Sequence, residues 1–416
     1  MLVMVVINGK NTCAYVYADI VDEATIKQIK LLVDQYFMKN IRVSIMADCH
    51  AGCGCVIGTT FQINDKIVPN LVGVDIGCGM LTVMLGKIDI DFKMLDNFIK
   101  ENIPAGMDVN GDGNDLSNII DNLRCYGSLK NIERLRKSIG SLGGGNHFIE
   151  IDKNENDEYY LIVHTGSRNL GLQVAKIYQD LAIKYHNNKI FNKKSAINEL
   201  ILKYKRLNLE AQIQNEIERI AQMNLEISIP RELCYLEGDE FDDYLYDMDI
   251  CQSFAALNRG EIAKKIVDFL GLDYDCLYKF ETVHNYINMN DKILRKGAIS
   301  AYAGEVVLIP MNMRDGCIIA RGKGNPLYNY SAPHGAGRIM SRAEAFKVIN
   351  VDNFKKVMKG IYTTTSNENT IDESPFVYKP MASILNNIND TVEVLQIIKP
   401  VYNFKATQGG MKYEKM

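Results

Sequence analysis

Two segments of the chain change abruptly from an apolar strand pattern to a loop rich in glycine. The first is IRVSIMADCHAGCGCVIGTT, which begins at Ile41, and the second is NLVGVDIGCGMLTVML, which begins at Asn70. Because glycine has no Cβ, such loops can turn sharply and bring the backbone close to a ligand. Similar junctions recur at SLGGGNHFIEI (141–151) and YYLIVHTGSRNLG (159–171). The chain therefore places polar groups on loops at strand ends, where scaffolds commonly carry catalytic residues.

The remaining pattern mixes strands and helices without a steady strand–helix alternation, which is typical of the α+β class. Helical spacing of apolar residues predicts helices at 24–40, from about 172, at 196–224 (a long surface helix or a helical pair) and at 241–270, the last broken near Gly260. Strand patterns occur at 1–8 (an edge or sheet strand), 41–46, 303–310 and 391–406, where coil follows the strand. We expect central mixed sheets flanked by helices, with the active site in a loop-lined cleft. We expect one catalytic domain over 1–416 with a helical excursion at about 195–228, although the length is also compatible with two intimate domains.

Composition limits the partners and the compartment. The net charge of −4 and the pI of about 6.0 exclude a uniformly basic nucleic-acid binder, so any RNA site needs a local basic patch or bound metal ions. No run approaches the roughly 18 apolar residues of a membrane span. The apolar N-terminus lacks the basic start and cleavage site of a signal peptide, and ten cysteines without such a signal indicate reduced thiols, so we expect a cytoplasmic protein.

Histidine is scarce, which makes its positions informative. Only His186, in KYHNNK, has an unremarkable helix-end setting. The other five lie in or beside strand-to-loop junctions rich in Gly, Asn or Ser: His50, His147, His164, His284 and His334. A single histidine in a loop is usually structural or solvated, but five of six in such settings indicate a shared site.

The loop VGVDIGCG adds two metal-type side chains. Asp75 and Cys78 are three residues apart, and a thiolate can bridge two ions whose charge keeps it deprotonated. A set of O, N and S ligands suits several divalent metals and does not choose between Zn and Mn. A buried small cysteine in a tight turn is an equally open interpretation of this motif alone. The spacing of Cys49, Cys53 and Cys55 matches no standard zinc pattern, so we expect structural cysteines there, with Asp48 and His50 as supporting or substrate contacts.

Eight motifs in sequence resemble the signatures of the RtcB family of RNA ligases. They run from about residue 24 to 405 and read DCHAGCGCVIGTT, VGVDIGCGM, LGGGNHFIEI, HTGSRNLG, LNRGEIA, VHNYI, RKGAISAYAGEVVLIP and SAPHGAGRIMSR. The resemblance implies an enzyme of RNA repair or tRNA processing that joins RNA 3′-phosphate or 2′,3′-cyclic phosphate ends to 5′-hydroxyl ends. It implies GTP and two Mn²⁺ ions per site as cofactors, a histidine–GMP intermediate, and RNA as partner. We expect a monomer; an activating protein is left open.

The resemblance also implies residue roles. Cys78 would bridge two ions, one held with Asp75 and His284 and the other with His147 and His164, and His334 would attack the α-phosphate of GTP. The nucleotide-binding residues would be Asn146, Glu150, Asn285, Pro310, Asn312, Met313, Cys317, Gly335, Ala336, Gly337, Tyr378 and Lys405. Candidates for RNA or nucleotide phosphates are Arg168, Asn169, Arg338 and Arg342.

One segment departs from the family pattern. Where members have PGSMG followed by a serine, this chain has Pro310 to Cys317 (PMNMRDGC), so a serine contact is lost or replaced by Asn312 or Arg314. Two other functions remain as alternatives. A metal-dependent phosphodiesterase that opens cyclic phosphates would need the metals but not His334, and an RNA-binding scaffold would need neither.

Overall fold

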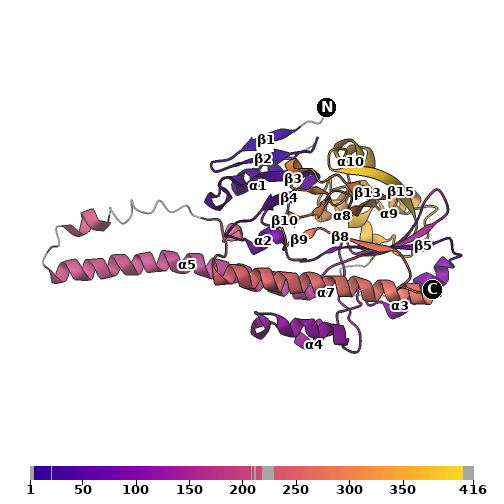
Figure 1. Cartoon of the computed structure of the whole chain (residues 1–416), viewed down its shortest axis with the longest axis horizontal. Coiled ribbons are helices and arrows are strands. Elements are labelled where there is room, and N and C mark those ends of the chain that lie inside the picture. The colour runs from indigo at the N-terminus through magenta and orange to yellow at the C-terminus, as the bar shows by residue number, and fades with distance from the viewer. Residues whose placement is uncertain (1–3, 20, 208, 210–211, 218–228, 406–416) are drawn as a thin grey trace.

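The computed structural model describes residues 4–19, 21–207, 209, 212–217 and 229–405, with 188–196 described by their backbone alone. Its strands form two large sheets and a small one (Figure 1). The six-stranded sheet has the order β1 (Val5–Asn8), β2 (Cys13–Val16), β3 (Val43–His50), β4 (Ile57–Gln62), β10 (Ile293–Lys296) and β9 (Asn285–Ile287). The seven-stranded sheet has the order β12 (Val306–Asn312), β13 (Gly316–Gly322), β15 (Val392–Lys405), β6 (Phe148–Lys153), β7 (Tyr159–Thr165), β5 (Gly79–Gly86) and β8 (Lys279–Val283). The small sheet pairs β11 (Ala298–Ser300) with β14 (Ser331–Pro333).

The seven-stranded sheet curls until its two edge strands approach each other. The backbone N–H of Leu308 on β12 donates to Thr282 Oγ1 on β8 at 3.0 Å. All pairings between described strands are antiparallel except that of β2 with β3. Side chains alternate between the two faces of a strand, so Met80, Phe148 and Ile162 fill the inside of the curl. Closure of this kind protects the edges of the sheet, and the ends of the strands remain available to carry the residues of a site.

Helices cover the outer faces of both sheets (Figure 1). Their bounds are α1 Glu23–Val33, α2 Pro69–Val72, α3 Phe92–Asn102, α4 Ile132–Arg136, α5 Arg168–Arg206, α7 Asp239–Phe269, α8 Arg342–Val348, α9 Val351–Val357 and α10 Met381–Asn387. Residues of α3 and α7, among them Leu95 and Ile262, pack with Leu81 and Ile149 on the outer face of the curled sheet. The α+β class expected from the sequence is confirmed. In the described residues, no helix combines the length and the apolar character that crossing a membrane requires.

Two helix predictions need correction. The break expected near Gly260 is absent, because α7 continues to Phe269 and a single glycine costs a helix only about 1 kcal/mol, which the buried neighbours Ile262 and Ala263 offset. The helix expected from about 172 begins at Arg168 and continues to Arg206, since no Gly or Pro interrupts 172–206. Figure 1 shows α5 projecting beyond the sheets. Of the expected excursion at 195–228, residues 218–228 lie outside the described residues.

The N-terminal strand prediction is confirmed. β1 lies at the edge of the six-stranded sheet and pairs with β2. The strands expected at 41–46, 303–310 and 391–406 are β3, β12 and β15, shifted by a few residues. The strand expected before the second glycine loop, in the segment that begins at Asn70, is wrong: residues Pro69–Val72 form helix α2, and the strand of this segment, β5, follows the loop.

Candidate active site

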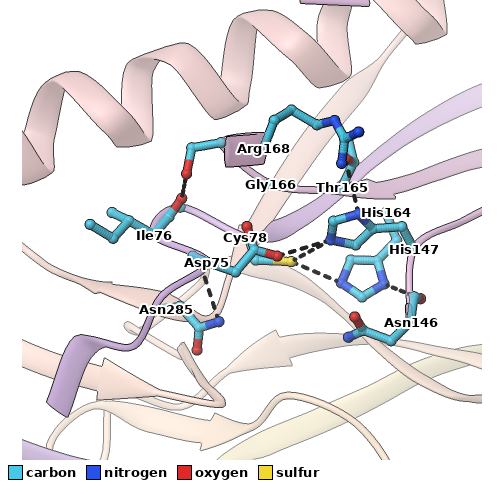
Figure 2. A network of polar contacts seen from close by, with 12 residues as sticks. Asp75, Ile76, Cys78, Asn146, His147, His164, Thr165, Gly166, Arg168 and Asn285 are labelled. Carbon is cyan, nitrogen blue, oxygen red and sulfur yellow. Dashed lines mark hydrogen bonds and ion pairs between the residues drawn. The ribbon is translucent and has the colours of Figure 1, made fainter. Parts of the chain in front are cut away.

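The five residues expected to hold metal ions converge at neighbouring strand ends of the curled sheet, and Figure 2 shows four of them, Asp75, Cys78, His147 and His164. Cys78 directly precedes β5, His147 directly precedes β6, His164 lies on β7, and His284 follows β8. These four strands are adjacent, in the order β6-β7-β5-β8. Asp75 lies in the loop before Cys78, and the peptide oxygen of Asp75 accepts from the Asn285 side chain at 3.3 Å. The topology therefore assembles groups that are more than 200 residues apart in sequence.

The ligand atoms form two groups that share the Cys78 sulfur. One is Asp75, Cys78 and His147, and the other is Cys78, His164 and His284, with all ligand atoms of a group within 4.8 Å of one another. Cys78 Sγ lies 3.5 Å from His147 Nε2 and 3.3 Å from His164 Nε2, and Asp75 Oδ2 lies 2.9 Å from His147 Nε2. The sulfur is thus in place to bridge two ions. The pairing implied by the resemblance, Asp75 with His284 and His147 with His164, is not the one that this geometry gives.

The chemistry of the donor set fits divalent metal ions. Burial lowers the pKa of His164 and of His284 well below the usual value, so both rings are neutral as ligands must be. Burial, and then the carboxylate of Asp75, raise the pKa of the Cys78 thiol well above its usual value, so a thiolate there needs metal charge beside it. His284 Nδ1 is buried without a hydrogen-bond partner among the described residues, and an orphaned buried nitrogen of this kind is costly unless a ligand satisfies it.

Carbonyl oxygens orient two of the rings. His147 Nδ1 donates to Leu142 O at 2.9 Å. His164 Nδ1 donates to Asn146 O at 3.1 Å (Figure 2). Each ring therefore turns its Nε2 lone pair toward Cys78. Such outer hydrogen bonds fix the tautomer of a metal ligand and raise its basicity.

A buried arginine holds the two metal loops together. Arg259 of α7 donates from Nη1 to Gly77 O at 2.8 Å and to Thr165 O at 2.9 Å, and its Nε lies 3.0 Å from Glu281. It is 1% exposed, so no water replaces these contacts. Arg259 stands in the motif LNRGEIA, but the sequence predicted no role for it, because its importance depends on contacts between distant segments.

His334 lies beside the metal cluster and is held by a buried carboxylate. It follows β14, and its ring centroid is 4.9 Å from that of His284. Its Nδ1 lies 2.6 Å from Asp48 Oδ2, which also accepts from the backbone N–H groups of His334 at 3.0 Å and Gly335 at 3.3 Å. Because a carboxylate can only accept, a neutral His334 ring carries its proton on Nδ1 and has its lone pair on Nε2. Asp48 is fully buried, and a Cβ on Gly337 (φ +72°) would lie 2.2 Å from Asp48 O, so this turn requires glycine.

A cavity of about 320 Å³ opens next to His334. It is bounded by His164 and His284 on the metal side and by Arg338 and Arg342 elsewhere. Eleven of the twelve predicted nucleotide-binding residues line it, namely Asn146, Glu150, Asn285, Pro310, Asn312, Met313, Gly335, Ala336, Gly337, Tyr378 and Lys405. The twelfth, Cys317, lies behind Glu150 with Sγ 3.9 Å from Glu150 Oε1. Residues predicted from separate motifs are thus brought to one cavity.

Glu373, which no sequence motif predicted, organises the cations of this cavity. Its carboxylate, 2% exposed, lies 2.9 Å from Lys405 Nζ, 3.2 Å from Arg338 and 3.1 Å from Arg342, and accepts from Tyr378 at 2.5 Å. Burial alone would raise the pKa of Glu373, but the three cations outweigh it and hold that pKa below its usual value. Glu373 ends a short 3-10 turn without strand or glycine-loop context, so its sequence carried no signal.

Three other predictions have mixed outcomes. Arg168 and Asn169 lie outside the cavity lining: Arg168 donates to Ser141 Oγ and Gly106 O, and Asn169 is exposed, so their phosphate role stays a prediction. In the segment that departs from the family pattern, Asn312 lines the cavity while Arg314 pairs with Asp315 at 2.7 Å, which favours Asn312 as the replacement contact. Cys49, Cys53 and Cys55 belong to no metal-type group among the described residues.

Similarity to known proteins shows the family to which the chain belongs. The family model described as tRNA-splicing ligase RtcB matches residues 35–127 and 117–406. The chain belongs to the RtcB family. It is 29% identical over 403 residues to the RNA-splicing ligase RtcB of Escherichia coli (strain K12), covering 88% of this chain and 90% of that protein. It is 27% identical over 426 residues to the tRNA-splicing ligase RtcB of Aeropyrum pernix, covering 80% and 81%. The resemblance is thereby confirmed, and the chain is an enzyme of an RNA ligase family.

Proposed function

We propose that the chain joins an RNA 3′-phosphate or 2′,3′-cyclic phosphate end to a 5′-hydroxyl end, with GTP consumed and GMP carried on His334. The single observation that carries this proposal is the position of His334 beside the cluster that shares Cys78, with its Nε2 free toward the same cavity. Two divalent ions held by Asp75, Cys78, His147, His164 and His284, which we propose to be Mn²⁺, would supply positive charge against the triphosphate.

In the first step, the Nε2 lone pair of His334 attacks the α-phosphorus of GTP. A phosphorus–nitrogen bond forms, the bond to the β-phosphate oxygen breaks, and pyrophosphate leaves. The ring becomes positively charged as the bond forms, and the Asp48 carboxylate 2.6 Å from Nδ1 stabilises that charge. Asp48 is therefore a positioning residue that also favours the charged ring.

Two transfers follow. An oxygen of the RNA 3′-phosphate attacks the bound GMP phosphorus, and the phosphorus–nitrogen bond breaks; a 2′,3′-cyclic phosphate must first be opened by water. The 5′-hydroxyl oxygen then attacks the 3′-phosphorus, loses its proton, and GMP leaves. Arg338 and Arg342 line the cavity and can face the phosphates in both transfers.

We place the base of the nucleotide against Glu150, which lines the same cavity. It lies three residues beyond His147 along β6, about 10 Å away at 3.3 Å per strand residue, which is a distance that a nucleotide spans between its α-phosphate and its base. A carboxylate accepts hydrogen bonds only. Guanine presents an N–H and an amino group on one edge, whereas adenine presents an acceptor nitrogen there, so Glu150 favours guanine.

The test uses two RNA strands, one ending in a 2′,3′-cyclic phosphate and one beginning with a 5′-hydroxyl, with Mn²⁺ and with or without GTP. We expect a joined product only with GTP, and none from His334→Ala. Opening of the cyclic end without joining, equally in wild type and His334→Ala, would instead identify a phosphodiesterase and reject the ligase.

A further inference from the structure

A buried acidic pair lies at the base end of the cavity, and only one of its two members, Glu150, has a role in the function proposed above. Glu150 and Asp152 are two residues apart on β6 and so share a face. Glu150 lines the cavity at 2% exposure, and Asp152 lies behind it at 0%. Cys317 of β13 completes the group, since one ligand-type atom of each residue lies within 4.8 Å of the others.

The polar contacts of this pair are unequal. Glu150 accepts from the amide nitrogen of Asn403 on β15 and is 3.9 Å from the Cys317 sulfur. Neither carboxyl oxygen of Asp152 has a hydrogen-bond partner among the described residues. The nearest cation, Lys405, is already engaged by Glu373 at 2.9 Å and by Asn146 O at 3.2 Å.

Two adjacent carboxylates at this depth cannot both be charged. Burial, and then the neighbouring Glu150, raise the pKa of Asp152 well above its usual value. Burial also raises the pKa of Glu150, but Asn403 and Lys405 oppose that shift and favour its charged form. The other titratable groups here are the Cys317 thiol and, opposite Asp152 on β7, the Tyr160 hydroxyl, and neither brings positive charge. The shared proton therefore belongs on Asp152.

We propose that Asp152 is a positioning residue whose carboxylic acid donates a hydrogen bond to Glu150 and thereby fixes the Glu150 carboxylate for the donor edge of guanine. This inference rests on the proposed function, because it assumes that a guanine occupies the base end. Asp152 itself touches no nucleotide. The consequence is that base selection depends on a proton held out of reach of solvent.

Two substitutions of Asp152 distinguish the loss of its hydrogen-bond donor from the loss of its packing. Asp152→Asn keeps an N–H donor toward Glu150, whereas Asp152→Leu keeps the bulk and removes the donor. For GMP attachment we expect Asp152→Asn to keep the KM for GTP within about threefold. We expect Asp152→Leu to raise that KM about tenfold or more, as loss of a hydrogen bond to a charged group does, with kcat little changed and discrimination against ATP reduced. The same KM for GTP in Asp152→Leu and wild type would overturn the proposal.

The pH dependence gives an independent readout. As pH rises and Asp152 ionises, the KM for GTP of the wild type should increase more steeply than that of Asp152→Asn, since ionisation of guanine itself affects both equally. Parallel KM profiles would contradict the proposal. Metal analysis is the further control, because a third ion per chain in wild type that is absent from Asp152→Asn would make the group a metal site and overturn the proton assignment.

The pH dependence of unfolding tests the protonation of Asp152 even if the proposed function is wrong. A group with a raised folded-state pKa contributes stability that is lost as pH rises toward that pKa. From pH 5 to 8 we therefore expect the urea midpoint of wild type to fall relative to that of Asp152→Asn. If the wild type attaches no GMP but shows this fall, the ligase function is refuted and the protonation of Asp152 is supported. Equal changes of the midpoint in the two proteins would refute the protonation of Asp152.

Discussion

Replacing Asp48 with Asn should slow GMP attachment while leaving the fold intact. The substitution keeps a side-chain oxygen near the ring but removes the negative charge 2.6 Å from His334 Nδ1. A hydrogen bond to a charged group contributes about 1.5–3 kcal/mol, and this one strengthens as the ring becomes positive. At about 1.4 kcal/mol per tenfold change in rate, the upper end of that range predicts a loss of about 100-fold.

The assay is the single-turnover rate of GMP attachment at saturating GTP and Mn²⁺. Asp247→Asn is the matched control, because Asp247 is equally buried and also accepts three hydrogen bonds, from Arg124 N, Cys125 N and Tyr178 Oη. We expect the control to keep a rate within about twofold of wild type if the loss reflects the reacting ring. A rate for Asp48→Asn as high as that of the control would refute the role of the carboxylate.

Three further variants, one of them with a matched control, test the metal cluster and the cations around Glu373. Cys78→Ala removes the shared ligand, so we expect the affinity for metal to fall by at least about tenfold. Less metal should then stay bound to the protein after gel filtration, and an unchanged metal content would refute the bridge. Gly166→Ala should lose metal similarly, because its Cβ would lie 2.1 Å from Asp75 Oδ1, whereas Gly111→Ala, where a Cβ meets nothing within 4 Å, should retain it. Glu373→Gln leaves Lys405 and Arg338 without their buried counter-charge, whereas Arg342 keeps Asp372 at 2.7 Å, and should cost about 3–5 kcal/mol of unfolding free energy at neutral pH. Because the folded pKa of Glu373 is lowered, that difference should shrink as pH falls below the usual pKa of glutamate, and a difference independent of pH in urea unfolding would contradict the assignment.

The sequence was informative where chemistry is local. The glycine loops, the three-residue spacing of Asp75 and Cys78, and the histidines at strand ends predicted which side chains the structure brings together. Strand alternation and apolar runs predicted β1, β3, β12 and β15 to within a few residues, because the period of a strand is a local property, but they did not predict short strands such as β2, β9 and β14.

What the sequence could not predict depends on long-range packing. The division of ligands into Asp75, Cys78 and His147 on one side and Cys78, His164 and His284 on the other depends on how segments far apart in the sequence pack in three dimensions. Glu373 acquires its role only because Lys405 and two arginines arrive from other segments. The continuity of α7 through Gly260 likewise depends on its buried face and not on local propensity.

The central claim, a single imidazole beside a thiolate-bridged metal pair, is tested most directly by the intact mass of the protein after incubation with GTP and Mn²⁺. We predict a mass gain equal to GMP in wild type, lost on brief acid treatment because a phosphorus–nitrogen bond is acid-labile, and no gain in His334→Ala. A GMP adduct that persists in His334→Ala, or that maps to another residue in wild type, would contradict the account.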